Sequence, residues 1–191
     1  MELNYSDEYM VDKENYKTSP YFNKKQANKL KIRSLDDCEQ IIVHCTAAGT
    51  SLWENPLTCI KYDMGPNHIS RSGCPTATYH FYINQKGETW QLVSMELVTW
   101  NCSGQNNNSV AICINHNGFN QDEITPELYQ SLVDTCCHVF DKLDWGYDSY
   151  GVADRIHFHR DYAPKACPGK LDKNQLIKDV AKRLETWGDS L

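Results

Sequence analysis

The sequence predicts an α/β domain in which a mixed central β-sheet is flanked by α-helices. A short apolar run stands at 41–43, and residues 76–93 read as two aromatic strands around a turn that contains glycine. Two amphipathic helical patterns follow in the second half of the chain. Short apolar runs suit buried strands, and helices with one apolar face pack on such a sheet. The chain has 191 residues and is 40% hydrophobic, which is enough to bury one core.

The strands are predicted from composition and from turn signals. The first is "IIVH", which ends at His44. The stretch "TATYHFYINQKGETWQLV" is rich in aromatic and β-branched residues, and it predicts a hairpin that turns at Gln85-Lys86-Gly87. "SVAICIN" at 109–115 predicts a third strand, and a strand-like piece follows at "IHFH", residues 156–159. These patterns leave the order of the strands open.

Two helices follow from apolar periodicity and capping signals. In "TPELYQSLVDTCCHVFDKL", Thr125 is a candidate N-cap and Pro126 occupies the first helical position, where its missing N–H costs nothing. A last helix is predicted at about 173–187, with Gly188 as its stop. The segment between the first strand and the hairpin reads as irregular. Residues 1–34 lack sustained apolar periodicity, so we expect a polar N-terminal extension before a single domain at 35–191.

Charge and composition exclude several classes of protein. The formal net charge of −6 argues against nucleic acid as a partner, because phosphate contacts need a basic face. No apolar run approaches the roughly 20 residues of a membrane span, and the N-terminus lacks the apolar core of a secretory signal. We therefore expect a protein that is cytoplasmic on synthesis. We also expect a monomer. The nine cysteines include no CxxC pair, so most are expected to be small buried hydrophobes.

The densest group of chemically active side chains is "IHFHRDYAPKACPG", residues 156–169. His159 and Cys167 lie eight residues apart, and Pro164 between them suits a loop that folds back. Catalytic zinc sites take three protein ligands from His, Cys and carboxylate side chains. The pair alone is weak evidence for such a site. His44, at the end of the first strand, offers a third ligand, although taken alone it is better explained as a core histidine.

Four motifs in register carry a resemblance to a known family. They are "VHCTA", "TYHFYI" before a glycine turn, "NNNSVAI" and "HRDYAPKACPG". Together they resemble the zinc-dependent N-acetylmuramoyl-L-alanine amidases of type 2, which include phage endolysins and share their fold with the peptidoglycan recognition proteins. The resemblance covers about residues 38–187. It implies cleavage of the amide between N-acetylmuramic acid and L-alanine in peptidoglycan, and hence a peptidoglycan or muropeptide partner.

The resemblance also implies a set of site residues, position by position. His44, His159 and Cys167 match the three ligands of the Zn²⁺ cofactor. Tyr79, in "TYHF", matches the tyrosine that hydrogen-bonds near the metal-bound water. Lys165 matches the lysine that polarises the scissile amide, and losing such a donor typically costs on the order of 100- to 1,000-fold in rate. The expected catalytic side chains are thus Tyr79 and Lys165.

The remaining polar candidates carry less information. Asn101 stands in "WNCSG" where many relatives have a histidine in "WHAG", so we expect it to contact substrate by hydrogen bonding. His157 competes with His159, because residues two apart on a strand face the same way. Family spacing selects His159 and leaves His157 a supporting role. Three further histidines have no partner pattern and are expected at the surface: His68, His116 and His138.

Other functions stay open on the sequence. The first is a non-catalytic module that binds peptidoglycan, although loss of the third ligand usually marks such members of the family. A muramidase would use paired carboxylates, for which Asp154 and Asp161 are available. A Cys45 nucleophile with His44 as its base is disfavoured, because neighbours on a strand diverge. A structural zinc site would also fit the ligands. Among biological roles, a phage or prophage endolysin is favoured over an enzyme that recycles wall fragments or is exported by a dedicated machine.

Overall fold

The computed structural model describes residues 3–48, 50–117, 124–146 and 149–187. They form a five-stranded sheet with helices on both of its faces, so the predicted fold class is confirmed. The strands are β1 (Gln40–Cys45), β2 (Phe81–Ile83), β3 (Thr89–Gln91), β4 (Ser109–Ile114) and β5 (Ile156–Phe158). The α-helices are α1 (Pro56–Met64), α2 (Pro126–Lys142), α3 (Ser149–Arg155) and α4 (Lys173–Leu184). Short 3-10 helices lie at Lys24–Lys29, Leu35–Asp37, Thr50–Trp53 and His159–Asp161.

The strand order is β3-β2-β4-β1-β5. The four strands from β2 to β5 in this order run parallel, and β3 is antiparallel to β2. The predicted hairpin is therefore present, with a positive φ of 77° at Gly87. A Cβ at Gly87 would lie 2.7 Å from the carbonyl oxygen of Glu127, so both the turn and the close approach of α2 require glycine.

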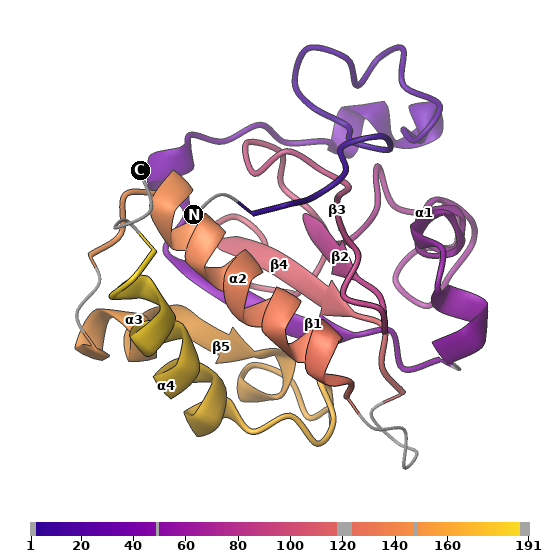
Figure 1. The fold of residues 1–191 in the computed structure, drawn as a ribbon. Coiled ribbons are helices and arrows are strands. Elements are labelled where there is room, and N and C mark those ends of the chain that lie inside the picture. The colour runs from indigo at the N-terminus through magenta and orange to yellow at the C-terminus, as the bar shows by residue number, and fades with distance from the viewer. Residues whose placement is uncertain (1–2, 49, 118–123, 147–148, 188–191) are drawn as a thin grey trace.

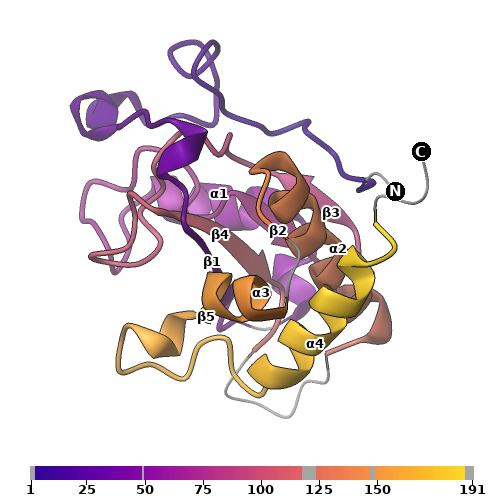
Figure 2. The ribbon, with the colours of Figure 1, turned by 90° about the vertical axis from the view of Figure 1, so that its left-hand side faces the viewer.

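Different helices pack on the two faces of the sheet. Figures 1 and 2 show α2 and α4 on one face and α1 on the other. Side chains alternate along β1, so Ile41, Val43 and Cys45 pack in the core beneath α2 and α4. His44 faces the α1 side, together with its β4 partner Cys113. This alternation places the first candidate ligand on the less covered face.

Helix α2 begins where its capping residues predict. The side chain of Thr125 accepts a hydrogen bond from the backbone N–H of Leu128 at 3.2 Å, and Pro126 is the first helical residue. Helix α4 ends at Leu184 rather than at 187, and the expected stop at Gly188 lies outside the described residues. The segment expected to be irregular contains α1, which Asn55 caps.

Isolated bridges join the segment of residues 3–34 to β3 and to the stretch of chain that follows β3 (Figure 1). Ser6 pairs with Trp90 and Val11 with Val93, and Val11 is buried. Such pairing covers the open edge of β3, which would otherwise expose unpaired backbone groups. Arg33, also buried, reaches under the loop before β4 and donates to the carbonyl oxygen of Met95 at 2.8 Å. The division into an extension and a domain at residue 35 stays a prediction.

Candidate active site and metal-binding cluster

The three predicted ligands meet on the α1 side of the sheet. His44 is the fifth residue of β1, and His159 directly follows β5. Because β1 and β5 are parallel neighbours with Val43 opposite Phe158, the next residue of each strand stands side by side. Cys167 returns to this point from the following loop. One ligand atom from each of these three side chains lies within 4.8 Å of the other two.

The donor set fits a zinc ion. The Cys167 Sγ lies 4.0 Å from His44 Nδ1, and the two imidazole rings have centroids 4.6 Å apart. His44 is only 1% exposed, and among the described residues its Nε2 has no hydrogen-bond partner. The ring nitrogen that faces the Cys167 thiol is Nδ1, so Nδ1 is the atom of His44 positioned to bind an ion in the cluster. Two imidazoles and one thiol are ligands that zinc favours.

The electrostatics of the cluster favour neutral imidazoles. Burial lowers the pKa of His44 well below 6.5, and the nearby His159 lowers it further. Burial also lowers the pKa of His159 to about 4, assisted by Lys165 and His68. Both rings are therefore uncharged at neutral pH, which is the state that coordinates a metal. The pKa of the Cys167 thiol is raised by the Cys45 side chain and by burial, so a metal that binds here must displace its proton.

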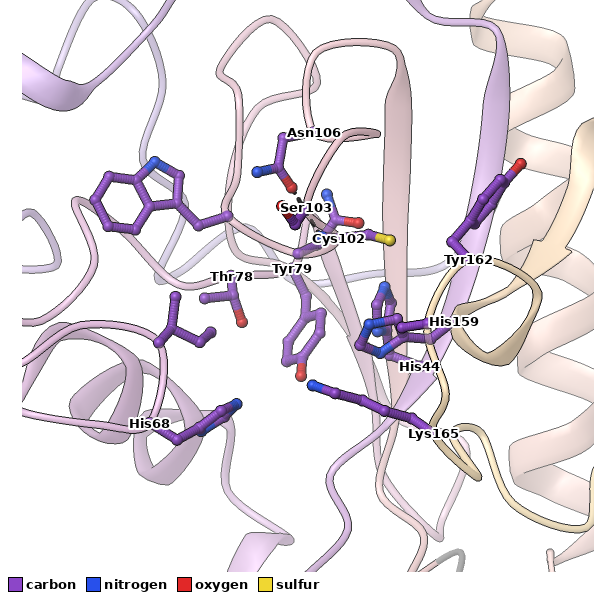
Figure 3. A pocket seen from close by; sticks show the side chains of 14 residues that line it. His44, His68, Thr78, Tyr79, Cys102, Ser103, Asn106, His159, Tyr162 and Lys165 are labelled. Carbon is purple, nitrogen blue, oxygen red and sulfur yellow. Dashed lines mark hydrogen bonds between the residues drawn. The ribbon is translucent and has the colours of Figure 1, made fainter.

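Tyr79 and Lys165 border the cluster from opposite sides. The ring of Tyr79 packs against His44 with 5.2 Å between centroids, and it lies just before β2 rather than within a strand. Figure 3 shows the amino group of Lys165 extending toward the Tyr79 hydroxyl, beside His44 and His159. Burial raises the pKa of Tyr79 well above its usual 10.0, so this hydroxyl is a neutral hydrogen-bond donor. Tyr79 and Lys165 can therefore place a hydrogen-bond donor and a positive charge at one point of the pocket.

Asn101 lines the same pocket but is held firmly from behind. Its amide nitrogen donates to the hydroxyl oxygens of Thr99 and Ser109, each at 3.2 Å, and the residue is 7% exposed. Asn101 also lies near His44, where it favours the protonated ring and so partly opposes the lowering of the His44 pKa. A contact with substrate therefore stays a prediction for Asn101, while its support of the pocket wall is visible.

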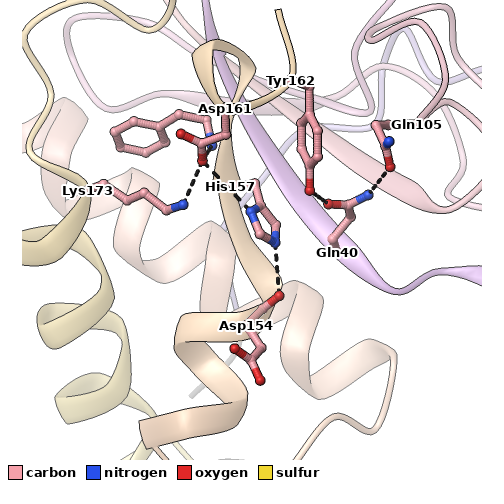
Figure 4. Close-up of polar contacts among 8 residues, drawn as sticks. Gln40, Gln105, Asp154, His157, Asp161, Tyr162 and Lys173 are labelled. Atoms are coloured by element: carbon pink, nitrogen blue, oxygen red, sulfur yellow. Dashed lines mark hydrogen bonds and ion pairs between the residues drawn. The ribbon is translucent and has the colours of Figure 1, made fainter.

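The loop that carries His159 is fixed by a polar network (Figure 4). Asp161 accepts from the backbone N–H of Phe158 at 2.9 Å and from the Lys173 amino group at 2.6 Å. His157 faces this network, with its Nε2 2.9 Å from the carbonyl oxygen of Asp154. His157 thus supports the loop, as expected. Neither of the carboxylates considered for a muramidase, Asp154 and Asp161, lines the pocket.

The pocket around the cluster has a volume of about 480 Å³. Sequence reasoning missed several of its walls, namely His68, Ile69, Thr78, Trp100, Cys102, Ser103, Asn106, Tyr162 and Ala163. Tyr162 and Ala163 lie inside the quoted motif around Cys167, and Trp100 precedes Asn101, so their closeness in sequence to candidate residues could have indicated them. His68 lies in a loop without a motif, so nothing in the sequence indicated that it lines the pocket. His116 and His138, expected at the surface, are instead 1% and 4% exposed, so that prediction was wrong.

Residues 34–170 match the sequence profile of the N-acetylmuramoyl-L-alanine amidases. The match covers most of the chain, and the chain belongs to this family. The resemblance stated from its motifs is therefore confirmed.

Solved structures share the fold at low sequence identity. The N-acetylmuramoyl-L-alanine amidase LysC from Clostridium intestinale URNW superposes with a TM-score of 0.61 at 19% identity, covering 88% of this chain and 94% of that one. The Ph2119 endolysin of a Thermus scotoductus MAT2119 bacteriophage gives 0.62 at 15% identity, covering 90% and 98%. Drosophila peptidoglycan recognition protein SA gives 0.60 at 14%, covering 87% and 89%. No curated protein matches the sequence. Within the described residues, the helices are too short or too polar to cross a membrane.

Proposed function

We propose that the chain hydrolyses the amide between the lactyl group of N-acetylmuramic acid and L-alanine in peptidoglycan, with Zn²⁺ held by His44, His159 and Cys167. Family membership supports the amidase activity. The observation that carries the zinc-dependent mechanism is the convergence of three ligand atoms within 4.8 Å, in a pocket that Tyr79 and Lys165 also line. Zinc in such a site supplies Lewis acidity, which polarises a carbonyl and makes water a stronger nucleophile at neutral pH.

The chain's own residues divide the remaining work. Lys165 brings a positive charge to the position where the amide oxygen becomes negative, and fixed charges of this kind act most strongly where water is excluded. Tyr79 keeps its proton at neutral pH and donates a hydrogen bond toward the same space. His44 and His159 stay neutral and oriented. The open pocket admits a peptide beside a glycan, and its walls align the scissile bond with these donors.

The biological setting is part of the proposal. Phage or prophage endolysins are among the proteins of this fold, and we propose the same role here: cytoplasmic synthesis, then action on the bacterial wall after release. We further propose that the protein acts as a monomer, because the cluster and the pocket are built from one chain. Light scattering of the purified protein tests the oligomeric state.

The decisive experiment is a digest of purified peptidoglycan with zinc-loaded protein, with chelator, and with zinc added back. Mass spectrometry would reveal new L-alanine amino termini on stem peptides released from a glycan that stays intact. We expect them to vanish with chelator and return with zinc. Cys167→Ser should lose bound zinc and activity together, whereas Cys102→Ser, a pocket cysteine outside the cluster, should keep its zinc. Wall binding without cleavage would instead identify a recognition module, and cuts within the glycan would refute the mechanism.

A further inference from the structure

The described lining of the pocket contains a cationic side chain and no acidic one, although the protein is acidic overall. The chain has a formal net charge of −6, yet none of the described residues that line the pocket is an aspartate or glutamate. The same walls carry Lys165 and three histidines. A pocket lined by one sign of charge and by hydrogen-bond donors selects ligands of the opposite sign. The part of the substrate that enters it is therefore expected to be anionic.

Among the described residues that line the pocket, His68 is the one histidine outside the metal-ligand set. It lies in the loop after α1, and its Nδ1 is 3.0 Å from the hydroxyl oxygen of Tyr62. Tyr62 is fixed in turn by a T-shaped contact with Trp53, with centroids 5.6 Å apart. Figure 3 shows the His68 ring on the opposite wall from Lys165, facing across the pocket toward it and Tyr79. The ring is exposed to the pocket and supported on its outer side.

The loop that carries His68 is anchored rather than loosely attached. The side chain of Asn67 donates to the carbonyl oxygen of Asp63 at 2.7 Å and accepts the backbone N–H groups of Ile69 and Ser70 at 2.8 and 2.9 Å. These bonds tie both sides of His68 to the end of α1. A side chain fixed in this way is suited to recognition, because little conformational freedom remains to be lost on binding.

We propose that His68 binds the free α-carboxylate of the second stem-peptide residue and so makes the protein select acidic over amidated stems. The inference rests on the proposed amidase function. When the Tyr62 hydroxyl donates to Nδ1, the proton of the neutral imidazole resides on Nε2. An Nε2–H donor then faces the pocket without any need for a charged ring. Hydrogen bonds from such donors to a carboxylate are among the stronger polar contacts.

The position of His68 fits the second residue of the stem. The metal-ligand cluster marks the amide that joins the lactyl group to L-alanine, and His68 is close enough to His159 to influence it electrostatically. The peptide continues from L-alanine across the pocket at about 3.5 Å per residue. In the second residue, D-glutamate, the chain runs through the γ-carboxyl group, so its α-carboxylate projects sideways. In amidated walls an uncharged carboxamide replaces that group.

The test compares two synthetic probes, N-acetylmuramoyl-L-alanyl-γ-D-glutamyl-L-lysinamide, which has a free α-carboxylate, and its D-isoglutaminyl counterpart. Both have lysinamide at the third position, so they differ in one carboxylate only. Hydrolysis by the zinc-loaded protein and calorimetric binding to the metal-free protein are measured for each. The variants are His68→Ala, His68→Gln, which restores a side-chain N–H, and Tyr62→Phe. Arg71→Gln, an exposed neighbour outside the pocket, controls for charge in the loop.

We expect the wild type to prefer the acidic probe on the order of tenfold, since a hydrogen bond to a charged group has about this effect at a partly exposed site. His68→Ala should bring the ratio of kcat/KM values to about one by slowing only the acidic probe, His68→Gln should restore part of it, and Tyr62→Phe should fall between. Arg71→Gln should keep the preference. Zinc content should not change.

Two results separate this proposal from the proposed function. If neither probe is cut but the acidic one binds more tightly through His68, the amidase mechanism fails and the recognition role of His68 stands. If both probes are cut equally well, or if His68→Ala slows the cleavage of both alike, the selectivity proposal is overturned and the amidase function survives. If neither probe is bound or cut, both are refuted.

Discussion

Asp63→Asn probes the buried carboxyl group that underlies one wall of the pocket. Asp63 lies in α1, is 3% exposed, and accepts hydrogen bonds from the backbone N–H and the hydroxyl of Thr78, at 2.7 and 2.9 Å. Thr78 lines the pocket and precedes Tyr79. Burial raises the pKa of Asp63 from 3.8 to about 6, despite the hydrogen bonds that oppose the rise. The carboxyl group therefore holds its proton more tightly in the folded than in the unfolded chain.

The sign of the pH dependence follows from that difference. Between pH 4 and pH 6 the folded state binds more protons at Asp63 than the unfolded state, so stability falls as pH rises. The contribution is fully present below the unfolded pKa and is lost once pH passes the folded pKa. The difference between the folded and unfolded pKa values of Asp63 corresponds to about 3 kcal/mol in the free energy of unfolding. About 1.4 kcal/mol of this contribution is lost between pH 5 and pH 8.

Urea unfolding followed by tryptophan fluorescence at pH 5 and pH 8 measures this effect. Histidines with lowered pKa values, such as His80 at about 3, act in the opposite direction, so the useful quantity is the difference between wild type and Asp63→Asn. Asparagine cannot ionise, and the variant should gain about 1.4 kcal/mol relative to wild type over this range. Asp141→Asn, an exposed change in α2, is the matched control. A wild-type-minus-variant difference that stays constant with pH would refute the reasoning.

Three further predictions concern other parts of the fold. Lys165→Ala should lower kcat by about 100- to 1,000-fold while zinc stays bound, because it removes charge near the amide oxygen; equal loss in Lys170→Ala, an exposed control, would contradict this. Arg33→Met should cost about 3 kcal/mol in urea unfolding, since it leaves one buried and two partly buried carbonyl oxygens without this donor; an unchanged midpoint would oppose the packing role of the N-terminal segment. Thr125→Ala should cost about 1 kcal/mol through the lost helix cap, with activity retained; unaltered stability would mean that the cap contributes nothing.

The predictions from sequence were most accurate where the local sequence signals agree with the tertiary structure. The strand before His44 is apolar on both faces and lies between two parallel neighbours, where such runs belong. Helix α2 carries its own cap in Thr125-Pro126. Asn55-Pro56 is the same signal at the start of α1, a segment that was expected to be irregular. The capping pair marks this helix in the sequence although the apolar periodicity that follows it is weak.

Other features depend on contacts that no local pattern carries. His138 is buried because Tyr5, from the N-terminal segment, packs on it with ring centroids 5.4 Å apart. That contact depends on the pairing of residues 3–34 with β3 and with the chain that follows it, which their polar composition does not predict. His68 enters the pocket for a similar reason, since the Tyr62 contact and the anchored loop place it there. For both side chains, position is a property of the assembled fold.

The alternation of β1 explains why the site favours metal chemistry over cysteine chemistry. His44 and Cys45 are adjacent, so their side chains leave opposite faces of the sheet and cannot form a nucleophile–base pair. The backbone N–H of Cys45, however, points to Cys167 Sγ at 3.2 Å, while His44 Nδ1 lies 4.0 Å from the same sulfur. The end of one strand thus supplies one ligand from its side chain and orients another through its backbone. Because the neighbouring strand end places His159, the sheet fixes two of the three candidate ligands, and the backbone of Cys45 orients the third.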